Sequence, residues 1–348
     1  MRNKFVCLLF AASFSMVSMA QDGDTTGTTP NAPARTITMY KMTDQIYMFK
    51  GKGGNIGIQI GEDGVLMIDS QFAEAIPEIV QLVQTLSDKP IQFLVNTHHH
   101  GDHTGGNKNM IFKGTIVYSH DNVRRRLVNQ ALLEESKEDN ANFEKQMEKL
   151  REDGNREIAE SKAKARVEEQ AKLRPKETAF PLITFSDNIT FHYNGETIMV
   201  FHVHNAHTDG DALVYFTESN ILHTGDVFFN GKYPFIDTKS GGNYEGYIKA
   251  LGQVLGMIDD ETKIIPGHGL IATKADVDFT HRMMKALLDR VSFQYVSGKS
   301  REEVMAMKNL SEEYDAKGFG AGFIATERFI GLIYDHAKKK YGKLDRKK

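Results

Sequence analysis

Residues 97–106 read THHHGDHTGG and follow the apolar run Ile91–Val95, which has the character of a buried strand. Histidine and aspartate are the usual nitrogen and oxygen ligands of zinc. In a chain that leaves a strand, alternate residues such as His98 and His100 can point the same way, so one cation can take both imidazoles. The loop is therefore predicted to bind metal.

The second half of the same loop extends the prediction to two metals. Gly101 lets the backbone fold tightly, so that Asp102 and His103 can serve a second cation beside the first. A surface histidine cluster is the alternative interpretation, but the order His-x-His-x-Asp-His and the Gly-rich exit favour a metal site. His99 lies between two predicted ligands and is expected to point elsewhere.

This motif resembles that of the metallo-β-lactamase superfamily, and three further motifs support the resemblance in the order that the family requires. They are His207 in NAHTDGD, Asp226 in LHTGDVFF and His268 in IIPGHG, each after an apolar run of strand character. The resemblance extends from about Tyr40 to Ile271. It includes GNIGIQIGEDGVLMIDS, which looks like the family's opening hairpin and contains Asp69.

The resemblance implies an α/β fold, the αββα metallo-β-lactamase sandwich, and a site for two Zn²⁺ ions per chain. The implied ligands are His98, His100 and His207 for the first metal, Asp102, His103 and His268 for the second, and Asp226 as the bridge. Nitrogen and carboxylate ligands suit zinc, although other divalent metals such as iron or manganese satisfy the same ligand types.

The family also implies which residues act on a substrate. Asp102 is the expected catalytic residue, because it can orient a hydroxide shared by the two metals and receive its proton. Tyr233, in the stretch after Asp226, is a candidate hydrogen-bond donor to the substrate carbonyl. The alternative role for Tyr233 is that of a packed loop aromatic.

The predicted function is that of an exported binuclear metal-dependent hydrolase, in which a metal-bound hydroxide attacks the carbonyl of a carboxylic ester, lactone or cyclic amide. A bridging aspartate such as Asp226 is typical of the family's thioesterases, lactonases and other esterases, whereas dedicated β-lactamases usually carry Cys or Ser there. A β-lactamase that hydrolyses β-lactam antibiotics is one alternative. The others are a di-iron redox protein and a non-catalytic metal-binding protein on the same fold.

The N-terminus predicts export. Residues 1–20 combine a basic start, an apolar stretch at 5–17 and a Ser-Met-Ala ending, which is the pattern of a cleaved signal peptide. The apolar stretch is too short to span a bilayer. The only cysteine, Cys7, lies inside this segment, so the mature protein can form no disulfide. We expect a periplasmic or secreted protein with no stable membrane insertion.

Charge and composition narrow the expected partners. The chain has 348 residues, of which 40% are hydrophobic and 26% charged, and its formal net charge is −3. This is an ordinary globular composition without the basic excess that nucleic-acid binding requires. The expected partner is a small-molecule substrate and not a nucleic acid.

Four segments make up the predicted domain organisation. After the signal peptide, residues 21–35 read as a disordered linker, 36–298 as the metallo-β-lactamase domain and 299–348 as a C-terminal helical extension. A helical insertion is expected at about 121–178, where residues 134–177 include 24 charged side chains among 44. It could act as a lid, or as a solvated arm or dimer contact. The C-terminal helices are expected to complete the core or to support a homodimer.

Within this plan, hydrophobic periodicity and turn residues predict the individual elements. Asn194-Gly195 is a strong two-residue hairpin signal between two strand-like runs, and Ser300 with Glu303 forms a capping-box start. The predicted strands are 54–60, 64–68, 91–95, 115–118, 189–192, 197–203, 211–216 and 221–224. The predicted helices are 75–86, 244–258, 276–296 and 323–338.

Overall fold

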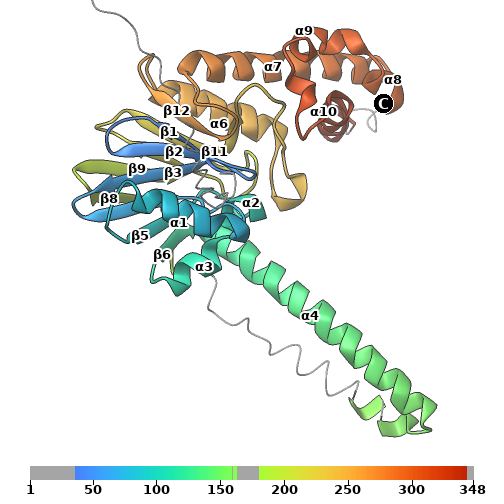
Figure 1. Cartoon of the computed structure of the whole chain (residues 1–348). Helices are drawn as coiled ribbons and strands as arrows, with labels where there is room; N and C mark the ends of the chain where they lie inside the picture. Colours follow the sequence, from blue (N-terminus) through green and yellow to red (C-terminus); the bar gives the residue numbers. More distant parts are fainter. Residues whose placement is uncertain (1–35, 159, 163–179, 343–348) are drawn as a thin grey trace, which may run out of the picture. The chain divides into compact units, whose positions relative to one another are not determined.

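The computed structural model describes residues 36–158, 160–162 and 180–342. The predicted signal peptide at 1–20 and linker at 21–35 lie outside the described residues. The chain from Thr36 onward forms one compact unit, shown in Figure 1. None of the described helices combines the length and the apolar character that crossing a membrane requires.

The first sheet contains seven strands that lie side by side in the order of the sequence. They are β1 (Thr38–Lys41), β2 (Ile46–Lys50), β3 (Ile56–Gly61), β4 (Gly64–Ile68), β5 (Ile91–Asn96), β6 (Ile116–His120) and β7 (Ile183–Phe185). Strands β1 to β4 pair antiparallel, and β4 to β7 pair parallel. Strands β1, β2 and β7 were not predicted from the sequence. Strand β2 is buried almost throughout and shows no alternation of polar and apolar residues.

The second sheet contains five strands in the spatial order β12-β11-β10-β9-β8. They are β8 (Asn188–Tyr193), β9 (Glu196–His202), β10 (Ala212–Phe216), β11 (Ile221–Phe229) and β12 (Lys263–His268). The predicted hairpin is confirmed, since Asn194 and Gly195 have φ angles of 53° and 77° and connect β8 to β9. Strand β11 runs five residues further than predicted, so Asp226 lies within a strand and not in a loop after one.

The αββα sandwich is confirmed by three apolar clusters. One lies between the sheets and joins residues such as Ile68 and Val95 to Val214 and Ile265. A second packs α1 (Ile76–Gln84) and α3 (Asn107–Phe112) against the first sheet. The third packs α6 (Tyr244–Met257), α7 (Lys274–Val296) and α10 (Thr326–Tyr341) against the second sheet.

The insertion begins as one long helix, α4 (Asp121–Glu152), directly after β6 (Figure 1). Its first turns are fixed to the sandwich, because Val123 is buried and Arg126 forms an ion pair with Asp209 at 2.6 Å. Residues 156–158 and 160–162 are also helical. Residue 159 and residues 163–178 of the predicted insertion lie outside the described residues.

The C-terminal region contains α8 (Arg301–Met305), α9 (Glu312–Asp315) and α10, with the 3₁₀ turns η4 (Lys308–Leu310) and η5 (Phe319–Ala321). The capping box of Ser300 and Glu303 is confirmed at the start of α8. Phe329 and Ile333 of α10 belong to the same apolar cluster as α6 and α7, so these helices complete the core. Helix α10 begins at Thr326 and not at Phe323, because Gly322 and Ala325 are extended.

Candidate metal centre

The histidine-rich loop follows β5 and leads into the short helix α2 (Gly101–Thr104). Asp69, after β4, anchors it: the Thr97 backbone N–H donates to Asp69 Oδ1 at 2.8 Å, and the Thr97 hydroxyl donates to Oδ2 at 2.7 Å. The same carboxylate accepts from His103 Nδ1 at 2.7 Å. One buried aspartate therefore fixes both the start of the loop and the ring of a predicted ligand.

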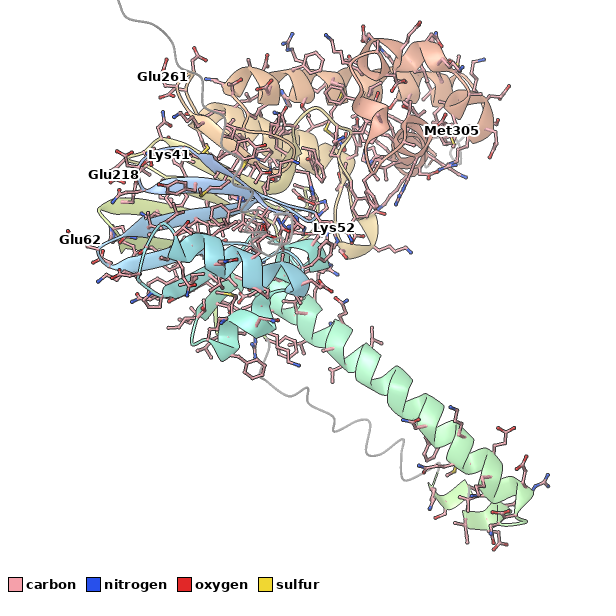
Figure 2. The ribbon with its side chains drawn as sticks, viewed as in Figure 1. Lys41, Lys52, Glu62, Glu218, Glu261 and Met305 are labelled. Carbon is pink, nitrogen blue, oxygen red and sulfur yellow. The ribbon has the colours of Figure 1, made fainter. Side chains whose placement is uncertain are left out.

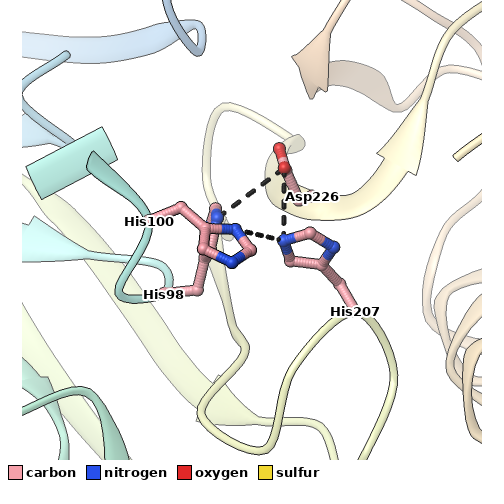
Figure 3. A group of neighbouring side chains, drawn as sticks. All are labelled: His98, His100, His207 and Asp226. Carbon is pink, nitrogen blue, oxygen red and sulfur yellow. Dashed lines mark hydrogen bonds and ion pairs between the residues drawn. The ribbon is translucent and has the colours of Figure 1, made fainter. Parts of the chain in front are cut away.

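The structure brings together all seven residues that the sequence predicted as metal ligands. Two groups form, and within each group the potential ligand atoms lie within 4.8 Å of one another. The first group is His98, His100, His207 and Asp226, which Figure 3 shows converging from three separate loops and strands. The second group is Asp102, His103 and His268.

Asp226 faces both groups, with one oxygen toward each. Its Oδ2 lies 3.6 Å from His98 Nε2 and 3.3 Å from His207 Nε2. Its Oδ1 lies 3.2 Å from His103 Nε2 and 3.4 Å from His268 Nε2. A carboxylate placed in this way can serve two cations at once.

The protonation pattern of the first group also fits a cation. His207 Nδ1 donates to the carbonyl oxygen of Phe235 at 2.7 Å, and His100 Nε2 donates to Asp237 Oδ2 at 3.0 Å. In neutral imidazoles the remaining nitrogens then carry lone pairs. These two nitrogens, His207 Nε2 and His100 Nδ1, face each other at 2.9 Å. Two acceptors at this distance repel each other unless a positive ion or a proton lies between them.

Buried polar atoms without partners mark the same point. Seven buried side-chain nitrogen or oxygen atoms of the described residues have no hydrogen-bond partner, and three of them are His98 Nε2, His103 Nε2 and Asp226 Oδ1. A buried polar atom left unpaired costs about 1–3 kcal/mol. All three atoms belong to the two groups, so a pair of divalent metal ions fits the residues present.

Charge within the centre favours ionised carboxylates. Burial opposes ionisation of Asp226, but the surrounding imidazoles of His103, His268 and His98 hold the pKa of its carboxyl well below its usual range. Burial likewise opposes protonation of His103, yet the carboxylates of Asp226 and Asp69 raise its pKa well above the usual value. The centre thus presents negative oxygens at its middle, as cation binding requires.

Two glycines allow the side chains to approach. A Cβ atom on Gly54 would lie 2.1 Å from the ring of His103, and one on Gly267 would lie 2.1 Å from Asp226 Oδ1. Both contacts are far below van der Waals distance. The glycines of GKGGN and PGHG therefore leave room for the candidate ligands.

The centre forms the floor of a cavity of about 700 Å³. His100, Asp102, Asp226 and His268 line it on one side. The remaining lining combines five aromatic side chains with lysines and glycines, and it includes Phe229, whose ring stacks on His268 at a centroid distance of 5.0 Å. A cavity of this size and lining suits a small organic molecule.

Tyr233 is placed differently from the predicted substrate donor. It lines the cavity, but it is buried, and its hydroxyl donates to Asp315 Oδ1 at 3.0 Å. Its ring stacks on Phe329 at 4.5 Å. The hydroxyl proton is engaged elsewhere, so the geometry favours the packed aromatic over the substrate donor.

Other histidines and the insertion lie outside the two groups that contain the seven predicted ligands. His99 Nε2 faces Ser240 Oγ at 3.3 Å, although His99 also forms a third set of potential ligand atoms with His100 and Asp237. His202 stacks on His120 at 3.8 Å. No described residue of α4 lines the cavity, so the described part of the insertion offers no support for a lid.

Sequence reasoning missed Asp237 as a functional residue. Its Oδ2 holds His100, while its Oδ1 accepts from the backbone N–H groups of Lys239 and Ser240. Partial burial raises the pKa of its carboxyl, but the hydrogen bonds from Ser240 and His100 outweigh burial and lower that pKa to about 2. The residue stands 137 positions after His100, and no local pattern marks this contact.

Comparison with protein families gives one match. A sequence model described as the metallo-beta-lactamase superfamily matches residues 50–268. That range holds all seven candidate ligands and ends at His268. No curated protein matches the chain.

Solved structures share the fold at low sequence identity. A metallo-beta-lactamase from Pontibacter korlensis superposes with a TM-score of 0.51 at 16% identity, covering 72% of this chain and 99% of that protein. The DIM-1 metallo-beta-lactamase gives the same TM-score and identity and covers 72% and 98%. The stereoselective inverting sec-alkylsulfatase Pisa1 from Pseudomonas sp. gives 0.61 at 16%, covering 86% of this chain and 50% of the sulfatase.

Proposed function

The chain belongs to the metallo-β-lactamase superfamily, and from this premise we propose that it is a binuclear metal-dependent hydrolase acting on a carboxylic ester, a lactone or a cyclic amide. Members of the superfamily are mostly hydrolases, and the similar solved structures include a metallo-beta-lactamase and a sec-alkylsulfatase. Membership of the family supports the reaction class, and both the activity and the substrate are part of the proposal.

The observation that carries the proposal is the division of Asp226 between two groups of ligands. One oxygen lies within 3.6 Å of His98 and His207 nitrogens, and the other lies within 3.4 Å of His103 and His268 nitrogens. A protein that only stored one cation would need a single complete group. Seven ligands in two groups around a shared carboxylate support a catalytic pair of metals.

Two divalent cations held there, zinc by preference, would polarise the substrate carbonyl and lower the pKa of a bound water toward neutrality. The chain's own residues prepare the site for this chemistry. Asp102 lines the cavity with its side chain 27% exposed, and its Oδ2 is 3.3 Å from His268 Nε2. Burial alone would raise the pKa of its carboxyl, but the hydrogen bond with His268 and the nearby His103 outweigh burial and lower that pKa overall. Asp102 is therefore ionised at neutral pH and can accept a proton.

The surrounding residues orient the ligands and limit access of water. Asp69, Asp237 and the carbonyl of Phe235 each hold one imidazole in a fixed tautomer. Phe229 covers one face of His268. The reacting group would therefore meet donors and ligands that need little reorganisation.

The preference for acyl substrates is proposed because the bridging residue is an aspartate, Asp226. The aspartate is typical of the family's esterases and lactonases, while dedicated β-lactamases usually carry Cys or Ser at that place. β-Lactam hydrolysis stays a secondary activity in the proposal, because a lactam is a cyclic amide and would present its carbonyl to the same groups.

A substrate panel tests the proposal. Zinc-reconstituted protein is assayed with a chromogenic β-lactam, an acyl lactone, a thioester, a phosphodiester and a sulfate ester, and bound metal is counted by mass spectrometry. We expect two metals per chain and turnover of the lactone or another acyl substrate. Turnover confined to the phosphodiester or the sulfate ester would overturn the acyl assignment, and no turnover with a full complement of metal would overturn the enzyme assignment.

Export belongs to the same proposal and is supported by the leader-like pattern of residues 1–20. The full chain, expressed with a C-terminal tag, should appear outside the cytoplasm with residues 1–20 removed. N-terminal sequencing of the mature protein checks the cleavage. A product that keeps Met1 and stays in the cytoplasm would contradict the prediction.

A further inference from the structure

Part of the cavity wall comes from a segment outside the family match. Phe323 and Ile324 line the cavity, although the superfamily model ends at residue 268. They lie in the short extended connection between η5 and α10, where Gly322 and Ala325 have extended backbone angles. The C-terminal region therefore contributes to the cavity as well as to the core.

Contacts with the rest of the wall hold this connection in place. The ring of Phe323 meets that of Phe235 edge-on at 5.9 Å, and the guanidinium of Arg328 lies 5.6 Å and 5.5 Å from these two rings. A Cβ atom on Gly322 would lie 3.0 Å from the side chain of Lys232. Phe323 is thus fixed from one side while its other side faces the cavity and solvent.

Aromatic surface is left uncovered at the cavity. Phe323 is 78% exposed, and Phe72, which lines the same cavity from the loop after β4, is 36% exposed. Burying an aromatic ring is worth about 1.5–3 kcal/mol, so leaving two such rings exposed beside one cavity forgoes that stabilisation. They offer a binding surface for an apolar group.

The acidic and the basic residues of the lining lie in different parts of the cavity. The acidic ones, Asp102 and Asp226, belong to the candidate metal centre. The basic ones are Lys50, Lys52 and Lys232, and none of them forms an ion pair with a carboxylate of the described residues. Figure 2 shows Lys52 at the end of the sandwich where α2 lies, while Glu62 and Glu218 lie at the opposite end. The lining thus carries unpaired positive charge apart from the metal centre.

We infer that the cavity selects a substrate made of an apolar body and an oxyanion, with Phe72 and Phe323 contacting the body and Lys50, Lys52 and Lys232 attracting the oxyanion. This inference rests on the proposed function, because it names the substrate class of the same site. The apolar faces supply affinity through burial, and the lysines favour an anion over its neutral counterpart.

Binding can be measured without turnover. The probes are 3-phenylpropane-1-sulfonate, the neutral 3-phenylpropan-1-ol and the small anion methanesulfonate, titrated by calorimetry into the zinc-loaded protein, with 4-phenylbutyrate as the carboxylate form of the oxyanion. We expect both aromatic anions to bind at least roughly tenfold more tightly than either the alcohol or methanesulfonate. Sulfonates are weak metal ligands, so their binding reports the wall and not the metals.

Variants separate the two parts of the wall. Phe323→Ala should weaken the binding of the aromatic sulfonate and of the alcohol alike, by roughly fivefold. Replacing Lys50, Lys52 and Lys232 together by Gln should remove most of the preference for sulfonate over alcohol. The matched controls are Phe293→Ala, an exposed ring on α7 outside the cavity lining, and Lys113→Gln, an exposed lysine after α3. Both controls should bind all probes as the unsubstituted protein does.

Equal affinity for the sulfonate and the alcohol would overturn the anionic part of the inference. Unchanged binding in Phe323→Ala, with a melting temperature like that of the parent protein, would overturn the part played by the C-terminal segment. Failure of the proposed function looks different: the probes would bind as expected while no acyl substrate is turned over.

Discussion

The floor and the wall of the cavity are built in opposite ways. On the floor, His98, His103 and Asp226 are buried to within 5% exposure, and most of the candidate ligands have a second partner that fixes their orientation. On the wall, Phe323 and Lys52 are exposed, and Phe323 contacts the ring of Phe235 edge-on and the guanidinium of Arg328. A buried polar network tolerates few changes, whereas an exposed wall can vary at little cost in stability.

This difference indicates that the floor and the wall have separate roles. In the proposed function, the buried groups of the two converging clusters would determine the reaction. The exposed aromatic and basic residues would determine which molecules reach the metal centre. Substitutions on the floor should therefore change metal binding and kcat, while those on the wall should change KM alone.

The largest effect is expected at Asp102, where Asn keeps the shape but cannot take a proton. Asp102→Asn should lower kcat by about 10²–10⁴-fold, the usual contribution of a general base. Its side chain is 27% exposed, so thermal unfolding should shift little. Steady-state kinetics and a melting curve are the measurements. Near-normal turnover in this variant would remove the catalytic role of Asp102.

A smaller effect is expected at Asp237, which orients His100. In Asp237→Asn the oxygen that caps Lys239 and Ser240 can remain, but an NH₂ group replaces the oxygen that accepts from His100 Nε2. Two donors would then face each other, and metal affinity should fall about 10–100-fold. Competition with a chromogenic chelator measures this.

The control for Asp237 is Asp259→Asn, which changes an aspartate that caps the distant turn at Glu261 and Thr262. Its metal affinity should equal that of the unsubstituted protein. If both variants bind metal equally well, the partner of His100 does not tune the centre.

A histidine pair outside the metal centre predicts that the stability of the fold depends on pH. Burial lowers the pKa of His202, stacked on His120, to about 4, whereas an unfolded histidine titrates near 6.5. The folded state thus binds fewer protons, so stability from this group is complete above pH 6.5 and is lost as the pH falls from 6.5 toward 4. With screening by solvent, the loss is about 1–2 kcal/mol.

His202→Gln should flatten that part of the stability curve. The free energy of unfolding of the variant and of the parent protein is measured with urea at pH 7, 5.5 and 4.5. Both proteins are first treated with a chelator, so that release of metal at low pH does not contribute. An equal decline in the variant and in the parent protein would place the acid sensitivity in other groups.

The smallest effect is expected on the wall. Arg328 stacks on Phe235 and Phe323 and is itself exposed, and such a contact is worth about 0.5–1 kcal/mol. Arg328→Gln should therefore raise KM about two- to fivefold for an aromatic substrate, with kcat and metal content unchanged. A loss of bound metal in this variant would show that floor and wall are not independent.

Much of the fold was readable from local pattern. Strand runs, the Asn194-Gly195 turn and the Ser300 capping box depend on residues that are close in sequence, and the structure confirms them. The unpredicted strand β2 and the late start of α10 depend on burial and on an extended connection, which alternation and periodicity do not report. The choice between the two roles of Tyr233 also depended on a distant residue, because its partner Asp315 is 82 residues away.

The sequence by itself determined the family, the αββα sandwich and the seven candidate ligands, because each ligand lies in a short motif with its own glycine or apolar flank. Only the tertiary structure decided how Asp226 divides its oxygens, that Asp237 holds His100 and that Phe323 reaches the cavity. These contacts join residues far apart in the chain. They exist only once two sheets and the C-terminal helices have packed, and no short-range pattern in the sequence records them.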